Sequence, residues 1–150
     1  MACEIFTSNI RSHVDVGSRL DGFIAHLLPF CRVTFIDLRK LNFRHGNFTF
    51  VQGSITKLPF ADGSVSSLSC LHVIEHIGLG RYGDPVDPEG YKKAARELLR
   101  VLAPDGRLYL STPVGTERVV FDAHRVFDPA TVVEAFAPAK LASFHLVPDV

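Results

Sequence analysis

The sequence contains few cysteines, and their arrangement excludes a disulfide framework. The 150 residues include three, Cys3, Cys31 and Cys70, which lie far apart and form no Cys-x-x-Cys pair. A small secreted domain held together by disulfides would carry an even, closely spaced set. We therefore expect a protein of the reducing cytoplasm.

The sequence also lacks an excess of one charge and lacks long hydrophobic runs. Sixteen basic residues balance sixteen acidic ones, which leaves no electrostatic footprint for nucleic acid and no basic run for a membrane surface. No apolar run approaches the length of a membrane span, and the start, MACEIFTSNIRS, lacks the basic and apolar regions of a secretory signal. At 47% hydrophobic and 21% charged residues, the chain is predicted to form one globular domain over residues 1–150, without nucleic-acid or membrane partners.

Short β-type runs alternate with helical stretches along the chain. Helices are predicted over residues 21–30, from Asp87 to Leu102, and over 127–137, where Asp128 caps the helix and Pro129 takes its first position. Strands are predicted over residues 13–18, 32–38, 48–55, 65–71, 107–114 and 141–150. This order predicts a doubly wound α/β domain with a mostly parallel sheet and helices on both faces.

Ligands of such sheets bind beyond the carboxyl ends of the strands, so the residues at the strand ends are the first site candidates. Asp37 closes the second strand, twenty positions after Gly17 at the end of the first. A carboxylate there can accept hydrogen bonds from a ribose diol, and a glycine allows close approach of a ligand. The alternative, a turn glycine and a solvated turn aspartate, would suffice for each residue alone, but the spacing favours a nucleoside site.

The loop after the first strand, DVGSRLDG, lacks the G-x-G-x-x-G pattern of nicotinamide and flavin dinucleotide sites. Those cofactors place a pyrophosphate at the start of the following helix. Asp21 would repel a pyrophosphate, whereas it need not repel a zwitterionic amino-acid tail. The loop therefore disfavours one alternative interpretation, a nicotinamide-dependent enzyme.

Four segments in order resemble a known family. HVDVGS, FIDL, GSITKLPFADGSVSSLSCLHVIEH and ARELLRVLAPDGRLYLSTP are similar to class I S-adenosylmethionine-dependent methyltransferases of the type 11 group, over residues 14–113. A later segment, FDAHRVFDP, resembles a methyltransferase-like subfamily known as a domain of unknown function. The resemblance implies a Rossmann-like core, S-adenosyl-L-methionine as cofactor, and methyl transfer to a small-molecule acceptor that the sequence does not identify.

The resemblance also implies roles for single residues. Asp15, Gly17 and Ser18 would belong to the loop that holds the methionine part of the cofactor, and Asp37 would bind the ribose hydroxyls. The remaining cofactor contacts implied are Leu38, Gly53, Ser54 and Ile55 around the adenine, and Leu71 and His72 beside the methionine tail.

The sequence departs from the family at several positions. Arg19 and Asp21 stand where the family has glycines, and Ser54 and Ser66 stand where it has acids. The family's final strand has no counterpart in this chain, and an unpaired strand edge favours a homo-oligomer or a completing partner. These departures support an alternative function, a non-catalytic cofactor-binding or scaffold module with the same fold.

The segment His72–His76 contains His-x-x-Glu-His, the spacing of an inverted zinc-protease motif. That motif needs a helix and a third ligand, for which Glu117 and Glu134 are loose candidates. Because the segment before His72 is predicted as a strand, we expect no metal here. In the methyltransferase context His76 becomes a catalytic candidate, and a packed histidine with a satisfied hydrogen bond is its alternative.

Three further residues are candidates for the acceptor side. His124 follows the fifth strand, where substrate should arrive, and could remove a proton from the acceptor. Arg125 could hold a carboxylate or phosphate, and Tyr82 could line the same pocket. In the alternative, Arg125 pairs with Asp122 or Asp128, His124 packs under the short helix, and Tyr82 is a surface aromatic.

Overall fold

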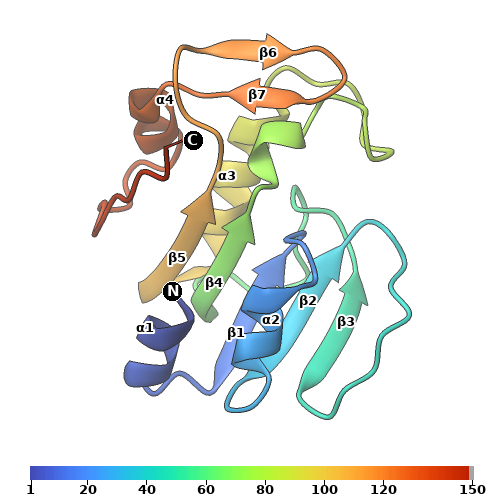
Figure 1. Ribbon diagram of the computed structural model, residues 1–150, viewed down its shortest axis with the longest axis vertical. Helices are drawn as coiled ribbons and strands as arrows, with labels where there is room; N and C mark the ends of the chain where they lie inside the picture. Colours follow the sequence, from blue (N-terminus) through green and yellow to red (C-terminus); the bar gives the residue numbers. More distant parts are fainter. Residues whose placement is uncertain (149–150) are drawn as a thin grey trace.

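A five-stranded parallel sheet forms the centre of the protein, as a computed structural model describing residues 1–148 shows (Figure 1). The strand order is β3-β2-β1-β4-β5, and every neighbouring pair is parallel. The strands are β1 (Ser12–Val16), β2 (Arg32–Asp37), β3 (Phe48–Gln52), β4 (Val65–Leu71) and β5 (Leu102–Ser111). The strand order reverses between β1 and β4, which is where ligands of such sheets bind.

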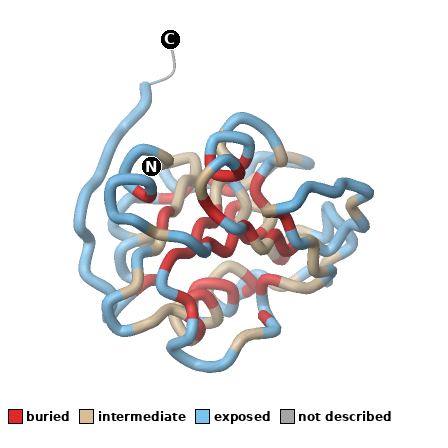
Figure 2. The backbone as a smooth tube through the Cα atoms, turned by 90° about the horizontal axis from the view of Figure 1, so that it is seen from below, coloured by how far each residue is buried: buried red, intermediate tan, exposed pale blue. Residues whose placement is uncertain are grey.

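Helices cover both faces of the sheet, which confirms the predicted doubly wound α/β class. The side chains of Val33 and Phe35 point toward one face, while Val14 and Ile36 point toward the other, because residues alternate along a strand. Buried backbone is concentrated between these layers (Figure 2). The first face packs on α1 (Ala2–Thr7) and α2 (Gly22–Leu27), and the second on α3 (Gly90–Val101) and α4 (Pro129–Ala135).

The helix predicted from Asp87 begins later, at Gly90. Asp87 still accepts a hydrogen bond at a helix start, from the backbone N–H of Glu89 at 3.0 Å, and its carboxylate pairs with Lys93. Its own N–H, however, donates to the carbonyl of Gly78 at 2.9 Å, which holds residues 87–90 in a turn. The predicted cap of α4 is confirmed, since Asp128 accepts from the N–H of Ala130 at 2.8 Å and Pro129 comes first.

The C-terminal segment contradicts the strand predicted over residues 141–150. Residues 141–148 have no regular structure, and Leu141, Phe144, Leu146 and Val147 are exposed. Positions 149–150 of that prediction lie outside the described residues. The segment runs along the outside of the molecule (Figure 2), and no strand within residues 1–148 pairs with it.

An antiparallel hairpin, absent from the prediction, lies between β5 and α4. It consists of β6 (Arg118–Val120) and β7 (His124–Val126), which pair with each other and not with the main sheet. The hairpin stands above the carboxyl ends of the strands, next to the short helix η1 (Ile74–His76) (Figure 1). No helix within residues 1–148 is long and apolar enough to cross a bilayer.

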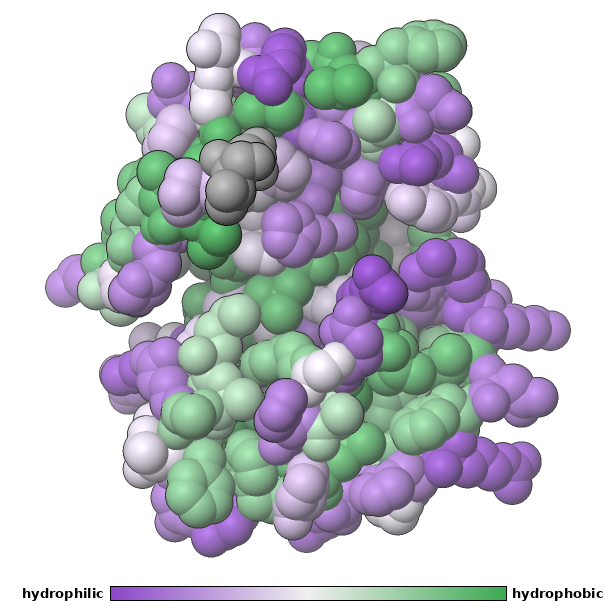
Figure 3. Space-filling model, in the orientation of Figure 1, coloured by the Kyte–Doolittle hydropathy of each residue, from purple (hydrophilic) through white to green (hydrophobic). Residues whose placement is uncertain are grey.

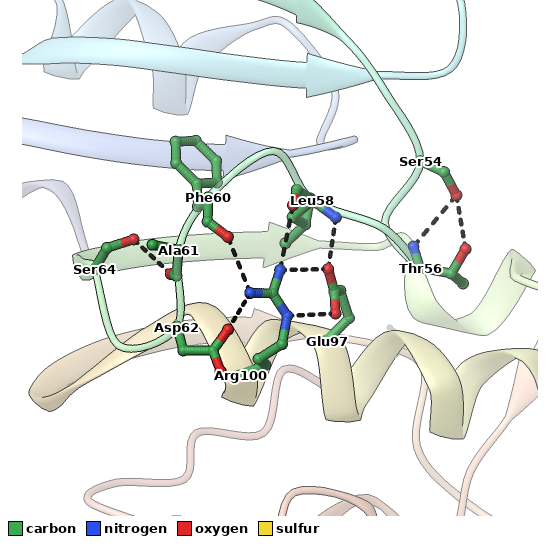
Figure 4. A network of polar contacts seen from close by, with 9 residues as sticks. All are labelled: Ser54, Thr56, Leu58, Phe60, Ala61, Asp62, Ser64, Glu97 and Arg100. Carbon is green, nitrogen blue, oxygen red and sulfur yellow. Dashed lines mark hydrogen bonds and ion pairs between the residues drawn. The ribbon is translucent and has the colours of Figure 1, made fainter.

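Arg100 ties the loop before β4 to α3 (Figure 4). Its guanidinium makes two hydrogen bonds to Glu97, at 2.8 and 2.7 Å, and further bonds to the carbonyls of Leu58 and Phe60 and to Asp62. Hydrogen bonds to these carboxylates raise the pKa of Arg100, so it stays charged. The planar guanidinium therefore supplies hydrogen-bond donors to carbonyl groups of a loop that makes few backbone hydrogen bonds of its own.

We expect Arg100→Ala to lower the melting temperature by about 3 to 6 °C, because the loop loses its three hydrogen bonds to the guanidinium and Glu97 loses its two. Arg100→Lys should recover only part of the loss, since an ammonium cannot form the bidentate pair. Thermal unfolding of both variants tests this, with exposed Arg96→Ala on the same helix as control. Equal melting temperatures for Arg96→Ala and Arg100→Ala would contradict it.

Candidate functional site

The carboxyl ends of β1, β2 and β4 meet below the hairpin, where the space-filling view shows a hollow across the molecule (Figure 3). Gly17 directly follows β1 with a φ of 70°, a conformation that favours glycine, and its N–H donates to the carbonyl of Ile36 at 2.7 Å. Gly17 and Asp37 therefore lie on adjacent strand ends, as the sequence predicted. A Cβ at Gly17 would lie 3.0 Å from a methyl group of the Val73 side chain, so a larger residue would fit only if Val73 shifted.

The Asp37 carboxylate lies at the carboxyl end of β2, where Arg39 forms hydrogen bonds to it. Its Oδ1 accepts from the backbone N–H of Arg39 at 2.8 Å and from Nε at 3.1 Å, and its Oδ2 accepts from Nη2 at 2.8 Å. The Asp37 side chain is only 11% exposed, against 61% for Arg39. The carboxylate is thus present where a ribose would need it, with a neighbouring cation already on it.

The residues expected around an adenine ring lie beside Asp37. The N–H of Gly53 donates to the carbonyl of Asp37 at 3.0 Å, and the Ser54 hydroxyl bonds the Thr56 hydroxyl at 2.9 Å. Leu38 is 36% exposed at the strand end, as a stacking residue would need to be. The Ile55 side chain differs, because it is buried in the core on the α3 face.

Asp15 and Ser18 are both buried, inside a polar chain that links β1 to β4. Asp15 accepts hydrogen bonds from the Ser69 hydroxyl, from the Ser18 hydroxyl at 2.7 Å and from the Ser18 N–H at 3.2 Å. The Ser18 oxygen accepts in turn from the N–H of Leu71 at 3.0 Å. This chain of hydrogen bonds therefore fixes the loop after β1 to the end of β4.

His13 completes this chain, and sequence reasoning missed it. It is fully buried, with Nδ1 2.7 Å from the Ser67 hydroxyl and Nε2 2.8 Å from the Ser69 hydroxyl. Since Ser69 gives its proton to Asp15, donor accounting puts the ring proton on Nε2 and lets Ser67 donate to Nδ1. The signal that could have found it was the Ser-x-Ser spacing in β4, which places both hydroxyls on the face of His13.

Burial moves the pKa values of the two ionisable members in opposite senses. Desolvation lowers the pKa of His13 from 6.5 to about 4. Desolvation also raises the pKa of Asp15 from 3.8 to about 6, although hydrogen bonds from Ser69 and Ser18 oppose the rise. At neutral pH this hydrogen-bonded chain therefore holds a neutral His13 imidazole and an ionised Asp15 carboxylate.

The His-x-x-Glu-His segment does not form the helix that a zinc motif needs. His72 sits at a bend with a φ of 55° and a 66% exposed side chain, and η1 covers only residues 74–76. Within residues 1–148 no three His, Cys, Asp or Glu side chains are placed to hold a metal ion. The Nδ1 of His72 lies 3.3 Å from the Glu75 carboxylate.

Glu75 is a buried carboxylate that the sequence did not single out as a site residue. It lies between Nδ1 of His72 and the hydroxyl of Thr112, each at 3.3 Å, with Nε2 of His76 at 4.0 Å. Burial raises its pKa above the usual range, while the nearby His72 opposes the rise. It connects the ends of β4 and β5 under the hairpin.

The two predicted catalytic histidines lie together. The ring centroids of His76 and His124 are 6.1 Å apart, and Tyr82 lies edge-on to His76 at 5.3 Å. The Nδ1 of His76 donates to the carbonyl of Ala123 at 2.9 Å, which leaves Nε2 as the basic atom. Desolvation lowers the pKa of His76, so the ring is neutral at physiological pH.

Arg125 does not share that site, because neighbouring residues of β7 point to opposite sides. Its guanidinium is 5.4 Å from the centre of the Tyr91 ring, and it donates to the carbonyl of Ile77. Within residues 1–148 neither Asp122 nor Asp128 pairs with it. It lines a separate cavity of about 150 Å³ with Tyr91, Glu117, Arg118, Val119, Val126 and Phe127.

The residues of the crevice fit a nucleoside with an amino-acid tail in part. Asp37 places a carboxylate at the end of β2, and Leu38 beside it exposes an apolar surface. Gly17 supplies backbone in a conformation open to close approach. At the loop's far side Arg19 and Asp21 pair with each other at 3.0 Å, in place of the glycines of the family. Together the strand order and this crevice define a protein with the class I S-adenosylmethionine-dependent methyltransferase fold.

Within this class, one protein family matches the chain directly. The family described as "Caenorhabditis protein of unknown function, DUF268" matches residues 59–141, more than half of the chain. The chain belongs to this family.

Known proteins with similar sequence or fold carry methyltransferase names. YcgJ of Bacillus subtilis, an uncharacterized methyltransferase, is 32% identical over 94 residues, which are 59% of this chain and 33% of that protein. Its crystal structure superposes with a TM-score of 0.64 at 20% identity, over 90% of this chain and 64% of that one. The chain thus spans a third of its curated relative.

Two further structures share the fold at low identity. The Burkholderia thailandensis 1,6-didemethyltoxoflavin-N1-methyltransferase, with its substrate and S-adenosylhomocysteine bound, matches with a TM-score of 0.63 at 20% identity, over 89% of this chain and 63% of that chain. The [4+2]-cyclase SpnF matches with a TM-score of 0.64 at 16% identity, over 89% of this chain and 53% of that chain. The same fold is therefore found in proteins named for different reactions.

Proposed function

We propose that this protein is an S-adenosylmethionine-dependent methyltransferase acting on a small-molecule acceptor in the cytoplasm. One observation carries the proposal. Gly17 and the Asp37 carboxylate lie at the adjacent ends of β1 and β2, next to the β1–β4 boundary where strand order reverses, and His76 and His124 lie nearby at the hairpin. The sequence resemblance and the named relatives support the same activity.

In this proposal the chain itself binds, orients and deprotonates. The cofactor, when bound, supplies a methyl group on a sulfonium with a neutral leaving group, so positioning and exclusion of water contribute most of the rate. Asp37 would orient the ribose, Leu38 and Gly53 would flank the adenine, and Leu71 would border the amino-acid tail. The buried chain from His13 to Ser18 would keep the loop after β1 in register.

His76 is the stronger candidate for the base that activates the acceptor. Its Nδ1 proton is fixed on the Ala123 carbonyl, and burial keeps the ring neutral, so Nε2 can accept a proton. His124 and Tyr82 would line the same acceptor site. Arg125, in its separate cavity, would contact an acceptor only if that molecule extends an anionic group behind β7.

The test is calorimetric titration with S-adenosylhomocysteine, which binds without turnover. Asp37→Ala should weaken binding at least thirtyfold, because two charge-assisted hydrogen bonds to the ribose are worth at least about 2 kcal/mol. Asp105→Ala is the matched control, since that carboxylate is exposed at the opposite end of the sheet. No binding by folded wild-type protein would refute the proposal.

A second candidate is a cofactor-binding or scaffold module without methyl transfer. The Arg19–Asp21 pair, which replaces loop glycines, and the SpnF fold match both favour it. It predicts that S-adenosylhomocysteine binds but that no labelled methyl group reaches any acceptor in a metabolite extract. The outer edge of β5 has no strand partner within residues 1–148, and in either case it suits a second copy or a partner. Labelling that is lost in His76→Ala would support the enzyme instead.

A further inference from the structure

Arg39 does more than neutralise Asp37, because it reaches across the mouth of the crevice. Its guanidinium carbon lies 5.3 Å from the centre of the Tyr82 ring, in the loop that follows β4. Arg81 lies 5.4 Å from the same ring and donates to the carbonyl of Ala123. One arginine from the end of β2 is thus held by a carboxylate below it and an aromatic ring above it.

The acceptors of Asp37 can be counted. An ionised carboxylate offers about four lone-pair positions, two on each oxygen. Arg39 uses both on Oδ1, through its backbone N–H and Nε, and one on Oδ2, through Nη2. Only one position is left, whereas a ribose diol donates two hydrogen bonds.

We propose that Arg39 is the residue that sets the affinity for a nucleoside at the ribose end of the crevice. It occupies the acceptors of Asp37 in the free protein, and a diol gains its second hydrogen bond only when the Arg39 side chain gives up its place. This inference rests on the proposed function, since it concerns the same nucleoside site. Removing Arg39 should therefore strengthen nucleoside binding, the opposite of what removing a ligand contact would do.

Titration with S-adenosylhomocysteine tests this. Arg39→Ala should bind it about three- to tenfold more tightly than the wild type, a range set by a bidentate ion pair whose arginine is largely exposed. Tyr82→Ala should change affinity in the same direction by less, because it removes only the upper contact of Arg39. Lys40→Ala, which loses the same charge at an exposed neighbouring position, should leave affinity unchanged.

A double-mutant cycle shows whether Arg39 acts through Asp37. In an Asp37→Asn background, Arg39→Ala should give no gain, because the charged acceptors for which Arg39 competes are gone. An equal gain in both backgrounds, or weaker binding by Arg39→Ala alone, would overturn the inference. If wild type and all variants fail to bind, the proposed function itself fails. If wild type binds and Asp37→Ala does not, only the role of Arg39 is at issue.

Discussion

Gly78→Ala is expected to lower the free energy of unfolding by at least about 4 kcal/mol, an exceptionally large effect for the addition of one methyl group. A Cβ at this position would lie 1.9 Å from the carbonyl oxygen of Asp87, which is backbone and cannot rotate away. Gly78 also has a φ of 80°, which an alanine adopts only with strain. The same residue closes the turn in front of α3, so relief of the clash would require that turn to open.

Two other glycines distinguish the effect of the close contact from the effect of the positive φ. Gly83 has a φ of 85° but nothing within 4 Å of the position that a Cβ would take, so Gly83→Ala should cost only about 1 kcal/mol for its conformation. Gly46 has neither constraint, and Gly46→Ala should stay within about 0.5 kcal/mol. Urea unfolding of the three variants gives the ranking. Equal losses for Gly78→Ala and Gly83→Ala would show that the contact with Asp87 does not hold.

The buried pair of His13 and Asp15 should give variants with opposite responses to acid. The folded pKa of His13 is lowered to about 4, so its contribution to stability is present above pH 6.5 and is lost as pH falls through 4. The folded pKa of Asp15 is raised to about 6, so its contribution is present below pH 3.8 and is lost as pH rises through 6. Each of these two pKa changes corresponds to about 3 kcal/mol of stability.

In the wild type these two contributions nearly cancel between pH 4 and pH 6.5. His13→Gln leaves only Asp15 to titrate, so its stability relative to wild type should rise by up to about 3 kcal/mol on acidification across that range. Asp15→Asn leaves only His13, and its relative stability should fall by a similar amount. Urea midpoints at a series of pH values measure both. Curves that stay parallel to wild type for both variants would contradict the burial described for this pair.

Local patterns predicted the five sheet strands and their layers, because apolar alternation and β-branched composition act over a few residues. The hairpin escaped prediction because β6 and β7 have three residues each. The strand predicted over residues 141–150 had the right alternation, yet a strand also needs a neighbour, and the sequence does not say where one lies. The start of α3 was misplaced since Asp-Pro is a strong cap signal, while the competing bond of Asp87 to Gly78 is a tertiary one.

The candidate site shows the same division. The positions of Gly17 and Asp37 could be predicted, because consecutive parallel strands bring their ends together. The role of His13 could not, since its partners Ser67 and Ser69 are 54 and 56 residues away. Nor did proximity in sequence put His124 and Arg125 in one site, because a strand turns neighbours to opposite sides. The clasp of Arg39 on Asp37 needed side-chain geometry.

The hairpin leaves and re-enters the domain at nearly one point. The N–H of Gly115 donates to the carbonyl of Phe127 at 2.9 Å, and the N–H of Phe127 donates to the carbonyl of Pro113 at 3.1 Å. The residues between them form one excursion from the domain, and the Ala123 carbonyl and the Arg125 guanidinium anchor it to the segment that follows β4. The mutual placement of the two histidines thus depends on how this one excursion is anchored, because His124 lies within it and its Ala123 carbonyl holds the ring of His76.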